Sequence, residues 1–168
     1  MNFLYRIILK TEDLVRRTRD KAYIEICKSR GLKVGKDVIF IEAPKFGSEP
    51  FLIEIGDRTK ITANCTFINH DGAMYVIRSM EKYQDARNFG RIKIGDNCIL
   101  GAGSVLNSSM PANSVFAGVP AKLICTIDEY GHKALKNNTD YPRELESNRA
   151  QLENHIRQHL PHVYKPVK

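Results

Sequence analysis

Large apolar residues recur every six positions in two stretches of this chain. The residues that keep this spacing are Ile55, Ile61 and Phe67 in the first stretch, and Ile94, Leu100 and Leu106 in the second. A six-residue period matches neither the two-residue period of a strand nor the period of about 3.6 residues of a helix, so these side chains cannot share one face of either element. They can all point inward in a solenoid whose short strands turn a corner every six residues. The repeat therefore predicts a mainly β fold built on a solenoid.

A segment of mixed, charged composition, residues 71–91, interrupts the repeat. Asn69, His70 and Asp71 stand at the point where the repeat stops. A long loop in an otherwise regular scaffold is a common place for binding. We interpret the segment as an excursion that leaves the solenoid beside the histidine and returns at about Arg91.

The chain divides by pattern into three parts. Apolar residues at three- and four-residue steps predict helix over residues 2–30. Beyond Asp128 we expect a helical tail, in which Tyr141-Pro142 opens a stretch rich in Glu, Arg, Gln and Asn. We therefore expect an N-terminal helical cap at 1–31, the solenoid at 32–127 and a C-terminal helical extension at 128–168. Within the solenoid, residues 44–50 begin and end with proline and are interpreted as a protruding turn that adds three residues to the spacing.

Size and charge limit the classes of partner. With 168 residues the chain is long enough for one well-buried domain and short for two. Its 26 Lys and Arg against 19 Asp and Glu give a net charge of +7, which suits nucleic acid, an anionic membrane or a phosphate-bearing small molecule. Aromatic and basic residues do not interleave as they do in nucleic-acid-binding domains, so we expect no nucleic-acid partner.

The basic N-terminal helix has two interpretations. The first is a cap on the open end of the solenoid or a contact with a neighbouring subunit, since terminal repeats need covering. The alternative is peripheral association with a membrane surface.

The four cysteines are Cys27, Cys65, Cys98 and Cys125, and they form no C-x-x-C pair, so we expect no metal site. Cys65 and Cys98 occupy equivalent positions of the repeat and are interpreted as core thiols in a reducing compartment. The first residues are a poor signal peptide, and no run approaches the length of a membrane span. We expect a cytoplasmic protein.

Three motifs resemble the signature of the hexapeptide-repeat acyltransferases: Ile94-Gly95-Asp96-Asn97, Gly101-Ala102-Gly103-Ser104-Val105 and Gly118-Val119-Pro120-Ala121-Lys122. Within that superfamily, His70-Asp71-Gly72 is most similar to the corresponding loop of bacterial polysaccharide or sugar O-acetyltransferases. The resemblance covers about residues 32–131. It implies a left-handed parallel β-helix, acetyl-CoA as co-substrate, a sugar or glycan acceptor and a homotrimer.

One departure from the family concerns the length of the solenoid. Relatives carry about one further coil between the Ile-Gly-Asp-Asn and Gly-Ala-Gly-Ser motifs, which here merge in the segment 94–104. Loss of a whole coil preserves the inward register, so we expect the fold to survive it. The space for the pantetheine arm would change, which leaves open an altered placement of the acyl donor or an inactive descendant.

The chemistry of acetyl transfer points to His70. Attack of a sugar hydroxyl on a thioester requires a base near physiological pH, and a neutral imidazole suits this task. His70 is the only histidine outside the C-terminal third of the chain and is our candidate general base. Direct attack on the thioester needs no nucleophilic residue, so a catalytic cysteine is disfavoured. Asn69, Asp71, Tyr75 and Arg78 are candidates for binding the acceptor or supporting the loop.

The remaining candidate site residues concern the acyl donor. Backbone N–H groups of Gly101, Ala102 and Gly103 could stabilise the oxyanion, although a tight solenoid corner would also favour such residues. In the family, coenzyme A lies in a groove between adjacent subunits of the trimer. With Gly101, the residues that the resemblance places along that groove are Ala102, Ser104, Ala117, Gly118 and Lys122. Lys122 would pair with a coenzyme A phosphate.

The predicted function is an acetyl-CoA-dependent O-acetyltransferase that acts on a sugar or glycan precursor in surface-polysaccharide synthesis. An aminosugar N-acetyltransferase on the same scaffold stays open. So does a noncatalytic trimeric scaffold that kept the solenoid and lost the cofactor slot.

Overall fold

The computed structural model describes residues 3–136 and 141–159. It contains two compact units, one that runs to Tyr130 and a second that starts at Gly131. Ten short strands are described: β1 (Lys33–Val34), β2 (Ile39–Phe40), β3 (Ile53–Ile55), β4 (Lys60–Ile61), β5 (Thr66–Phe67), β6 (Ile92–Ile94), β7 (Ile99–Leu100), β8 (Val105–Leu106), β9 (Ser114–Gly118) and β10 (Ala121–Thr126). The α-helices are α1 (Phe3–Ser29), α2 (Met74–Arg78), α3 (Ile127–Lys136) and α4 (Arg149–His159), and the 3-10 helices are η1 (Pro50–Leu52), η2 (Glu81–Tyr83) and η3 (Arg143–Ser147).

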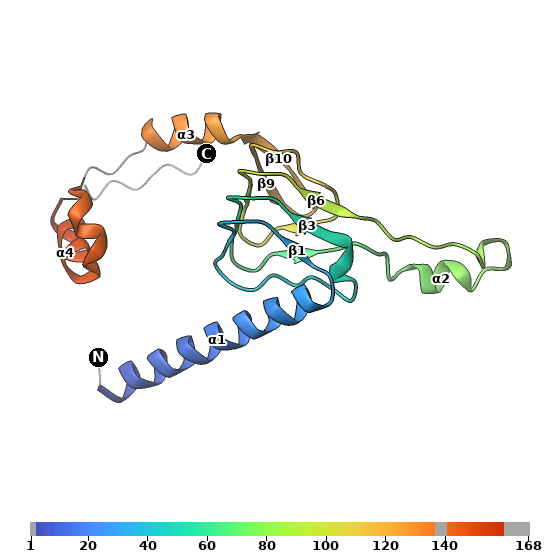
Figure 1. Cartoon of the computed structure of the whole chain (residues 1–168), viewed down its shortest axis with the longest axis horizontal. Helices are drawn as coiled ribbons and strands as arrows, with labels where there is room; N and C mark the ends of the chain where they lie inside the picture. Colours follow the sequence, from blue (N-terminus) through green and yellow to red (C-terminus); the bar gives the residue numbers. More distant parts are fainter. Residues whose placement is uncertain (1–2, 137–140, 160–168) are drawn as a thin grey trace. The chain divides into compact units, whose positions relative to one another are not determined.

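The strands of the first unit form three sheets that the chain visits in turn (Figure 1). β3, β4 and β5 lie in the first, second and third sheets, and β6, β7 and β8 repeat that order one level higher. Each strand pairs in parallel with the equivalent strand of the next circuit, for example Ile61 with Leu100. We call each circuit a coil. The parallel pairing that the repeat predicted is confirmed.

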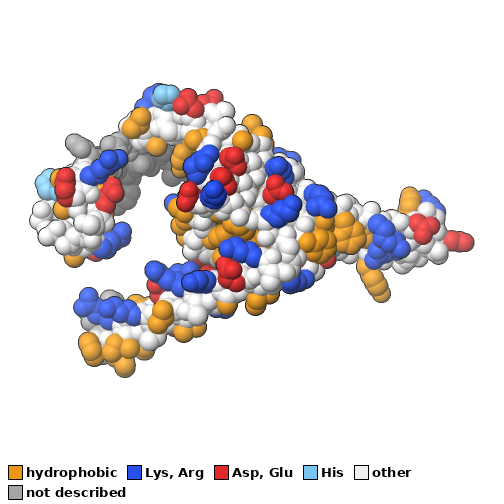
Figure 2. All heavy atoms as spheres, viewed as in Figure 1, with side chains coloured by type: hydrophobic (Ala, Val, Ile, Leu, Met, Phe, Trp, Pro, Cys, Tyr) orange, Lys and Arg blue, Asp and Glu red, His pale blue; other side chains and the backbone are white. Residues whose placement is uncertain are grey.

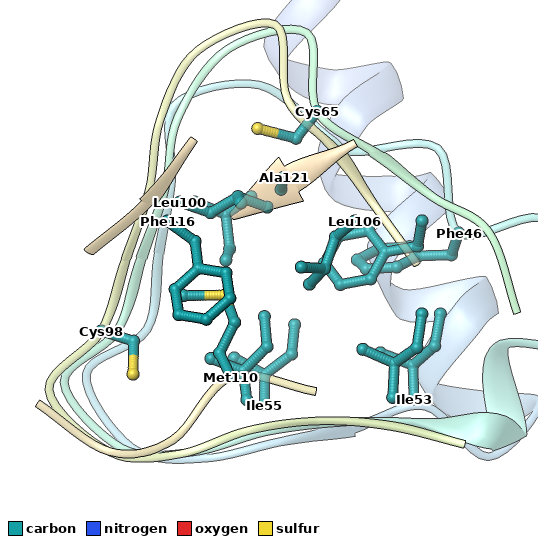
Figure 3. Close-up of a cluster of buried hydrophobic side chains, with 14 of the residues drawn as sticks. Phe46, Ile53, Ile55, Cys65, Cys98, Leu100, Leu106, Met110, Phe116 and Ala121 are labelled. Carbon is teal, nitrogen blue, oxygen red and sulfur yellow. The ribbon is translucent and has the colours of Figure 1, made fainter. Parts of the chain in front are cut away.

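The side chains at the six-residue positions fill the interior of the coils. All six repeat residues are at most 2% exposed, and Figure 3 shows Ile55, Leu100 and Leu106 pointing into the triangle that the backbone encloses. Cys65 and Cys98 are each 1% exposed and lie at two different corners of the triangle in Figure 3, as expected for core thiols. Deleting one such aliphatic side chain to alanine costs about 2–5 kcal/mol in a close-packed core.

Aspartate side chains form hydrogen bonds between successive coils at the corner that joins the first and second sheets. Asp57 accepts the Lys36 N–H at 2.8 Å, and Asp96 accepts the Asp57 N–H at 2.8 Å one coil higher. The next residue in each corner, Arg58 or Asn97, has a positive φ of 52° or 55°. The aspartate hydrogen bond and the positive-φ residue together fix where the next strand begins.

Two insertions change the spacing between coils. Paired residues of the first and second coils are 21 apart, as in Lys33 and Glu54, which is three more than three six-residue steps. The extra residues fall between Lys45 and Ile53. They do not make a protruding turn as predicted, because Pro44, Phe46 and Pro50 are fully buried.

The second insertion is the loop at residues 71–91. Pairs between the second and third coils are 39 apart, as in Ile53 and Ile92, so the loop supplies the excess over one coil. It carries α2 and η2 and leaves the coil stack between β5 and β6 (Figure 1).

Helix α1 agrees with the predicted helix at residues 2–30 to within one residue at each end. Its C-terminal part packs on the first coil, where the Tyr23 ring stacks on Phe46 with centroids 6.2 Å apart and Cys27 is 1% exposed. The Tyr23 hydroxyl also accepts the Phe46 N–H at 3.2 Å. This part of the helix therefore covers the open end of the core.

The last coil ends in a hairpin. β9 pairs in parallel with β7, and β10 then returns antiparallel to β9, with Ala121 opposite Gly118. Helix α3 begins with reciprocal bonds in which Thr126 donates to Glu129 Oε2 and the Glu129 N–H donates to the Thr126 hydroxyl. In the second unit, η3 and α4 confirm that the tail is helical.

Candidate active site

His70 lies where the chain leaves the third sheet and enters the loop. Its backbone forms an antiparallel bridge with Phe89, and the Gly90 N–H donates to the Asn69 carbonyl at 2.7 Å. The rings of His70 and Phe89 lie 5.7 Å apart, tilted by 33°. The outgoing and returning strands of the loop are therefore joined at its root, and this junction holds the histidine.

A carboxylate from the coil below contacts the histidine ring. Oε2 of Glu49 lies 2.6 Å from Nδ1 of His70, and the two side chains are 18% and 35% exposed. Both atoms are buried, and no hydrogen bond to either of them is found among the described residues. A carboxylate this close to Nδ1 favours the ring tautomer with hydrogen on that atom.

The register of the coils explains why Glu49 meets His70. Lys45 pairs with Thr66, and Glu49 and His70 each follow a member of that pair by four residues. Glu49 is therefore the residue that the 21-residue offset places beneath the histidine. Glu49 was not predicted from the sequence because residues 44–50 were interpreted as a protruding turn. The three added residues that produce the 21-residue offset between the first two coils were, however, recognised.

Asn69 holds this arrangement from the other side. It is only 4% exposed, and its side-chain amide donates to the Glu49 carbonyl at 2.7 Å. The predicted loop-supporting residue thus ties the backbone of Glu49 to the backbone beside His70.

A cavity of about 240 Å³ opens next to the ring. Its lining is mostly polar: Ile68, Asn69, His70, Asp71, Asn88, Gly90, Arg91, Ile92 and Asn107. With Nδ1 turned toward Glu49, Nε2 is the ring nitrogen left for this space. A base beside amide, carboxylate and guanidinium groups suits a polar substrate with several hydroxyls.

The other predicted acceptor residues divide into two groups. Asp71 lines the cavity, and its side chain accepts the Ala73 N–H at 2.8 Å, which shapes the start of the loop. Tyr75 and Arg78 lie on α2 and are exposed, Tyr75 by 80%, and neither lines the cavity.

The residues predicted to hold the acyl donor gather at a different corner. Ser104 is fully buried, and its hydroxyl donates to the Gly101 carbonyl at 2.6 Å and accepts the Gly118 N–H at 3.1 Å. Ala117 lies opposite Lys122 in the β9–β10 hairpin, and a Cβ on Gly101 would lie 2.8 Å from that of Ala117. Ser104 thus links the motif at 101–105 to the motif at 118–122 by hydrogen bonds. From the sequence, the two motifs were related only because both were expected to contact coenzyme A.

Two of the three predicted oxyanion donors already have partners. The Gly101 N–H donates to the Phe116 carbonyl at 2.8 Å, and the Gly103 N–H donates to the Ala63 carbonyl at 2.9 Å. The Ala102 residue is exposed. In the described residues its N–H has no such partner, so it is the amide available to a ligand.

The two groups do not meet within one chain. His70 follows β5 at the corner between the third and first sheets, whereas Gly101 to Gly103 join β7 in the second sheet to β8 in the third. None of the acyl-donor candidates lines the cavity beside His70.

Within residues 3–136 and 141–159, no group of three or more His, Cys, Asp or Glu side chains is placed to hold a metal ion. None of the described helices is long and apolar enough to cross a bilayer.

Several solved structures are remotely similar to this chain. A maltose O-acetyltransferase from Clostridium difficile 630 is 18% identical, with 61% of this chain and 73% of that one covered and a TM-score of 0.36. A hexapeptide-repeat-containing acetyltransferase from Vibrio cholerae is 14% identical, with 64% and 81% covered and a TM-score of 0.33. These TM-scores are too low for either structure to place a residue of the site.

Sequence comparison gives stronger evidence of a relationship than the solved structures do. No protein-family model matches the chain. Protein CapG of Staphylococcus aureus is 36% identical over 142 residues, which span 73% of this chain and 81% of CapG. The six-residue repeat seen in the sequence is realised in stacked coils, so the chain is a hexapeptide-repeat protein, and it belongs to the family of Protein CapG.

Proposed function

We propose that this protein is an acetyl-CoA-dependent O-acetyltransferase that acts on a sugar or glycan precursor in surface-polysaccharide synthesis. The observation that carries the proposal is the 2.6 Å contact between Glu49 and His70 beside a polar cavity. Further support comes from the motifs that resemble hexapeptide-repeat acyltransferases. The left-handed sense of the coil and a cytoplasmic location are part of the same proposal.

In this mechanism His70 is the general base. Its Nε2 accepts the proton of an acceptor hydroxyl as the hydroxyl oxygen attacks the thioester carbonyl carbon. Glu49 stabilises the imidazolium that results. When the carbon–sulfur bond breaks, His70 returns the proton to the leaving thiolate, so the ring ends neutral and the acetyl group is on the acceptor oxygen.

The Ala102 N–H is the proposed donor to the oxyanion, because the Gly101 and Gly103 amides are engaged in the coil. Lys122 is exposed on β10 and fits the role of a partner for a coenzyme A phosphate. Gly118, at φ 104°, lets the backbone turn where a ligand could approach closely. Ser104 supports these residues from within the core.

In this proposal a second copy of the chain completes the site. His70 lies at one corner of the coil stack and the acyl-donor candidates Ala102 and Lys122 lie elsewhere on it, which supports placing the thioester between neighbouring copies. A homotrimer with three equivalent grooves fits this placement. Residues 32–127 then carry the chemistry, and nucleic acid has no part in it.

The experiment is to measure acetyl-CoA binding by calorimetry and then turnover with hydroxyl and amine sugar acceptors. The proposal expects binding and faster transfer to the hydroxyl acceptor. Preference for the amine would instead identify an aminosugar N-acetyltransferase. Absence of acetyl-CoA binding by the folded protein would favour a scaffold and overturn the proposal.

A further inference from the structure

The first turns of α1 carry an unusually large exposed apolar surface. In Phe3–Lys10, which we call the N-terminal segment, six of the eight residues are large and apolar or aromatic. Their exposed fractions are 77% for Phe3, 59% for Leu4, 62% for Tyr5, 43% for Ile7, 42% for Ile8 and 54% for Leu9. Single exposed apolar residues are ordinary, but a contiguous group of this size marks an interaction surface.

The N-terminal segment is not part of the cap on the coils. Side-chain bonds between α1 and the coils begin at Asp20, which accepts the Ala43 N–H at 3.3 Å, and continue with Tyr23. All residues from Phe3 to Glu12 are exposed. The capping interpretation therefore accounts for the end of α1 and leaves its beginning without a function.

The charges of this segment are all positive. Arg6 and Lys10 lie one helical turn apart, and the first acidic residue along the helix is Glu12. At about 100° per residue, the six apolar side chains spread over roughly 240° of the helix, and the two cations share the remaining arc. Figure 2 shows Lys and Arg side chains along one edge of α1 and apolar side chains gathered along the other near its start.

This distribution favours a lipid surface over a partner helix. A helix–helix seam uses a narrow apolar stripe, about two residues in seven. A bilayer interface can bury a wide apolar arc while Lys and Arg remain at the level of the headgroups. Tyr5 has the apolar body and polar tip found at such interfaces.

We propose that the N-terminal segment docks this protein on the surface of an anionic lipid bilayer. The apolar arc enters the boundary between headgroups and acyl chains, and Arg6 and Lys10 contact lipid phosphates. The site is distinct from the acetyl-transfer site and does not depend on the proposed function.

The test is co-sedimentation of the full chain with vesicles of phosphatidylcholine alone or mixed with phosphatidylglycerol. We expect binding to the mixed vesicles that weakens as salt is raised, and little binding to phosphatidylcholine alone. Because the chain contains no tryptophan, Tyr5→Trp supplies a unique fluorophore, whose emission should shift to the blue on binding.

Two double variants separate the contributions. Arg6→Gln with Lys10→Gln should weaken binding roughly tenfold or more, since each basic residue near an anionic surface contributes appreciably. Lys36→Gln with Lys60→Gln removes the same charge from exposed positions on the coils and should have little effect. Ile7→Ser with Ile8→Ser should abolish binding while thermal unfolding stays unchanged.

Failure of the wild-type chain to sediment with the mixed vesicles would overturn the proposal. So would equal losses for the two charge variants, because binding would then follow net charge alone. If Ile7→Ser with Ile8→Ser instead changes the sedimentation-velocity mass without lipid, the segment joins copies of the chain and the lipid proposal is wrong.

Discussion

Oε2 of Glu49 and Nδ1 of His70 lie 2.6 Å apart, although the two residues belong to different coils and are separated by 21 positions. The contact exists because three residues are added between Lys45 and Ile53, which moves Glu49 to a place under the start of the loop. The carboxylate and the imidazole are thus brought together by the stacking of coils rather than by one sequence motif.

Replacing His70 by alanine should remove the general base. We expect the rate of acetyl transfer to fall about 10²- to 10⁴-fold, the usual contribution of a positioned base. The affinity for acetyl-CoA, measured by calorimetry, should change little because the variant keeps Lys122, the proposed partner of a coenzyme A phosphate. An unchanged rate in the folded variant would rule out the mechanism even if the protein is an acetyltransferase.

Glu49→Gln should slow turnover without weakening acetyl-CoA binding. The amide keeps the shape of the side chain and loses the charge that stabilises the imidazolium, so we expect a decrease in kcat of about tenfold or more. Nitrogen chemical shifts of the His70 ring should report a change in tautomer balance. Glu42→Gln is the matched control, since Glu42 is a carboxylate on the same coil that accepts the Asn64 N–H at 3.3 Å. If both variants lose activity equally, Glu49 has no specific role.

Lys122→Ala should weaken acetyl-CoA binding modestly and leave kcat nearly unchanged. The side chain is exposed, so an ion pair with a phosphate is expected to contribute about 0.2–1 kcal/mol, or up to roughly fivefold in Kd. The difference between the variant and wild type should shrink at high salt. Lys60→Ala, an exposed lysine in the same sheet, serves as the control. A loss of the same size in both would mean that the effect is one of overall charge.

Ser104→Ala should destabilise the fold. Its hydroxyl is buried and joins the Gly101 carbonyl to the Gly118 N–H, so we expect a loss of about 1–3 kcal/mol in the free energy of unfolding, measured in urea. Ser108→Ala, at an exposed neighbouring position, should change stability by no more than about 0.5 kcal/mol. A fully stable Ser104→Ala protein that binds acetyl-CoA poorly would show that the hydroxyl contacts the ligand instead.

The start of α3 should respond to pH through Glu129. Bonds from the Thr126 backbone N–H and hydroxyl lower the pKa of this carboxyl below its usual value. Its contribution to folding is therefore present above the usual pKa and is lost as the pH falls through the lowered pKa. Thr126→Val should raise the pKa of Glu129 in a carbon-detected NMR titration, whereas Thr126→Ser should leave it in place. Equal pKa values in all three proteins would show that the Thr126 hydroxyl takes no part in the cap.

The fold was predictable because the six-residue repeat that determines it can be recognised in the sequence. A six-residue repeat specifies inward positions, and Ile61, Leu100 and Leu106 are buried as expected. The long loop could be placed for the same reason, since residues that break the repeat cannot continue a coil. Helix α1 was predictable from apolar residues spaced three and four positions apart.

The candidate site was only partly predictable because it depends on contacts between coils. His70 and Asn69 stood out at the end of a repeat, but the partner, Glu49, carries no motif and becomes visible only when the offset between coils is known. Ser104 was assigned to the ligand by resemblance, and the amides of Gly101 and Gly103 were candidate oxyanion donors because small residues let a ligand approach. The backbone and side-chain bonds that occupy them are a property of the packed structure.

The closed root of the loop has a consequence for how acceptor range could diversify. The His70–Phe89 bridge and the bond from Gly90 to Asn69 hold both ends of the excursion to the rigid stack. Segments of different length and composition could therefore replace its middle without moving the imidazole. If the proposed function holds, exchange of this interchangeable module between related chains would alter which acceptor is bound while the imidazole stays in place.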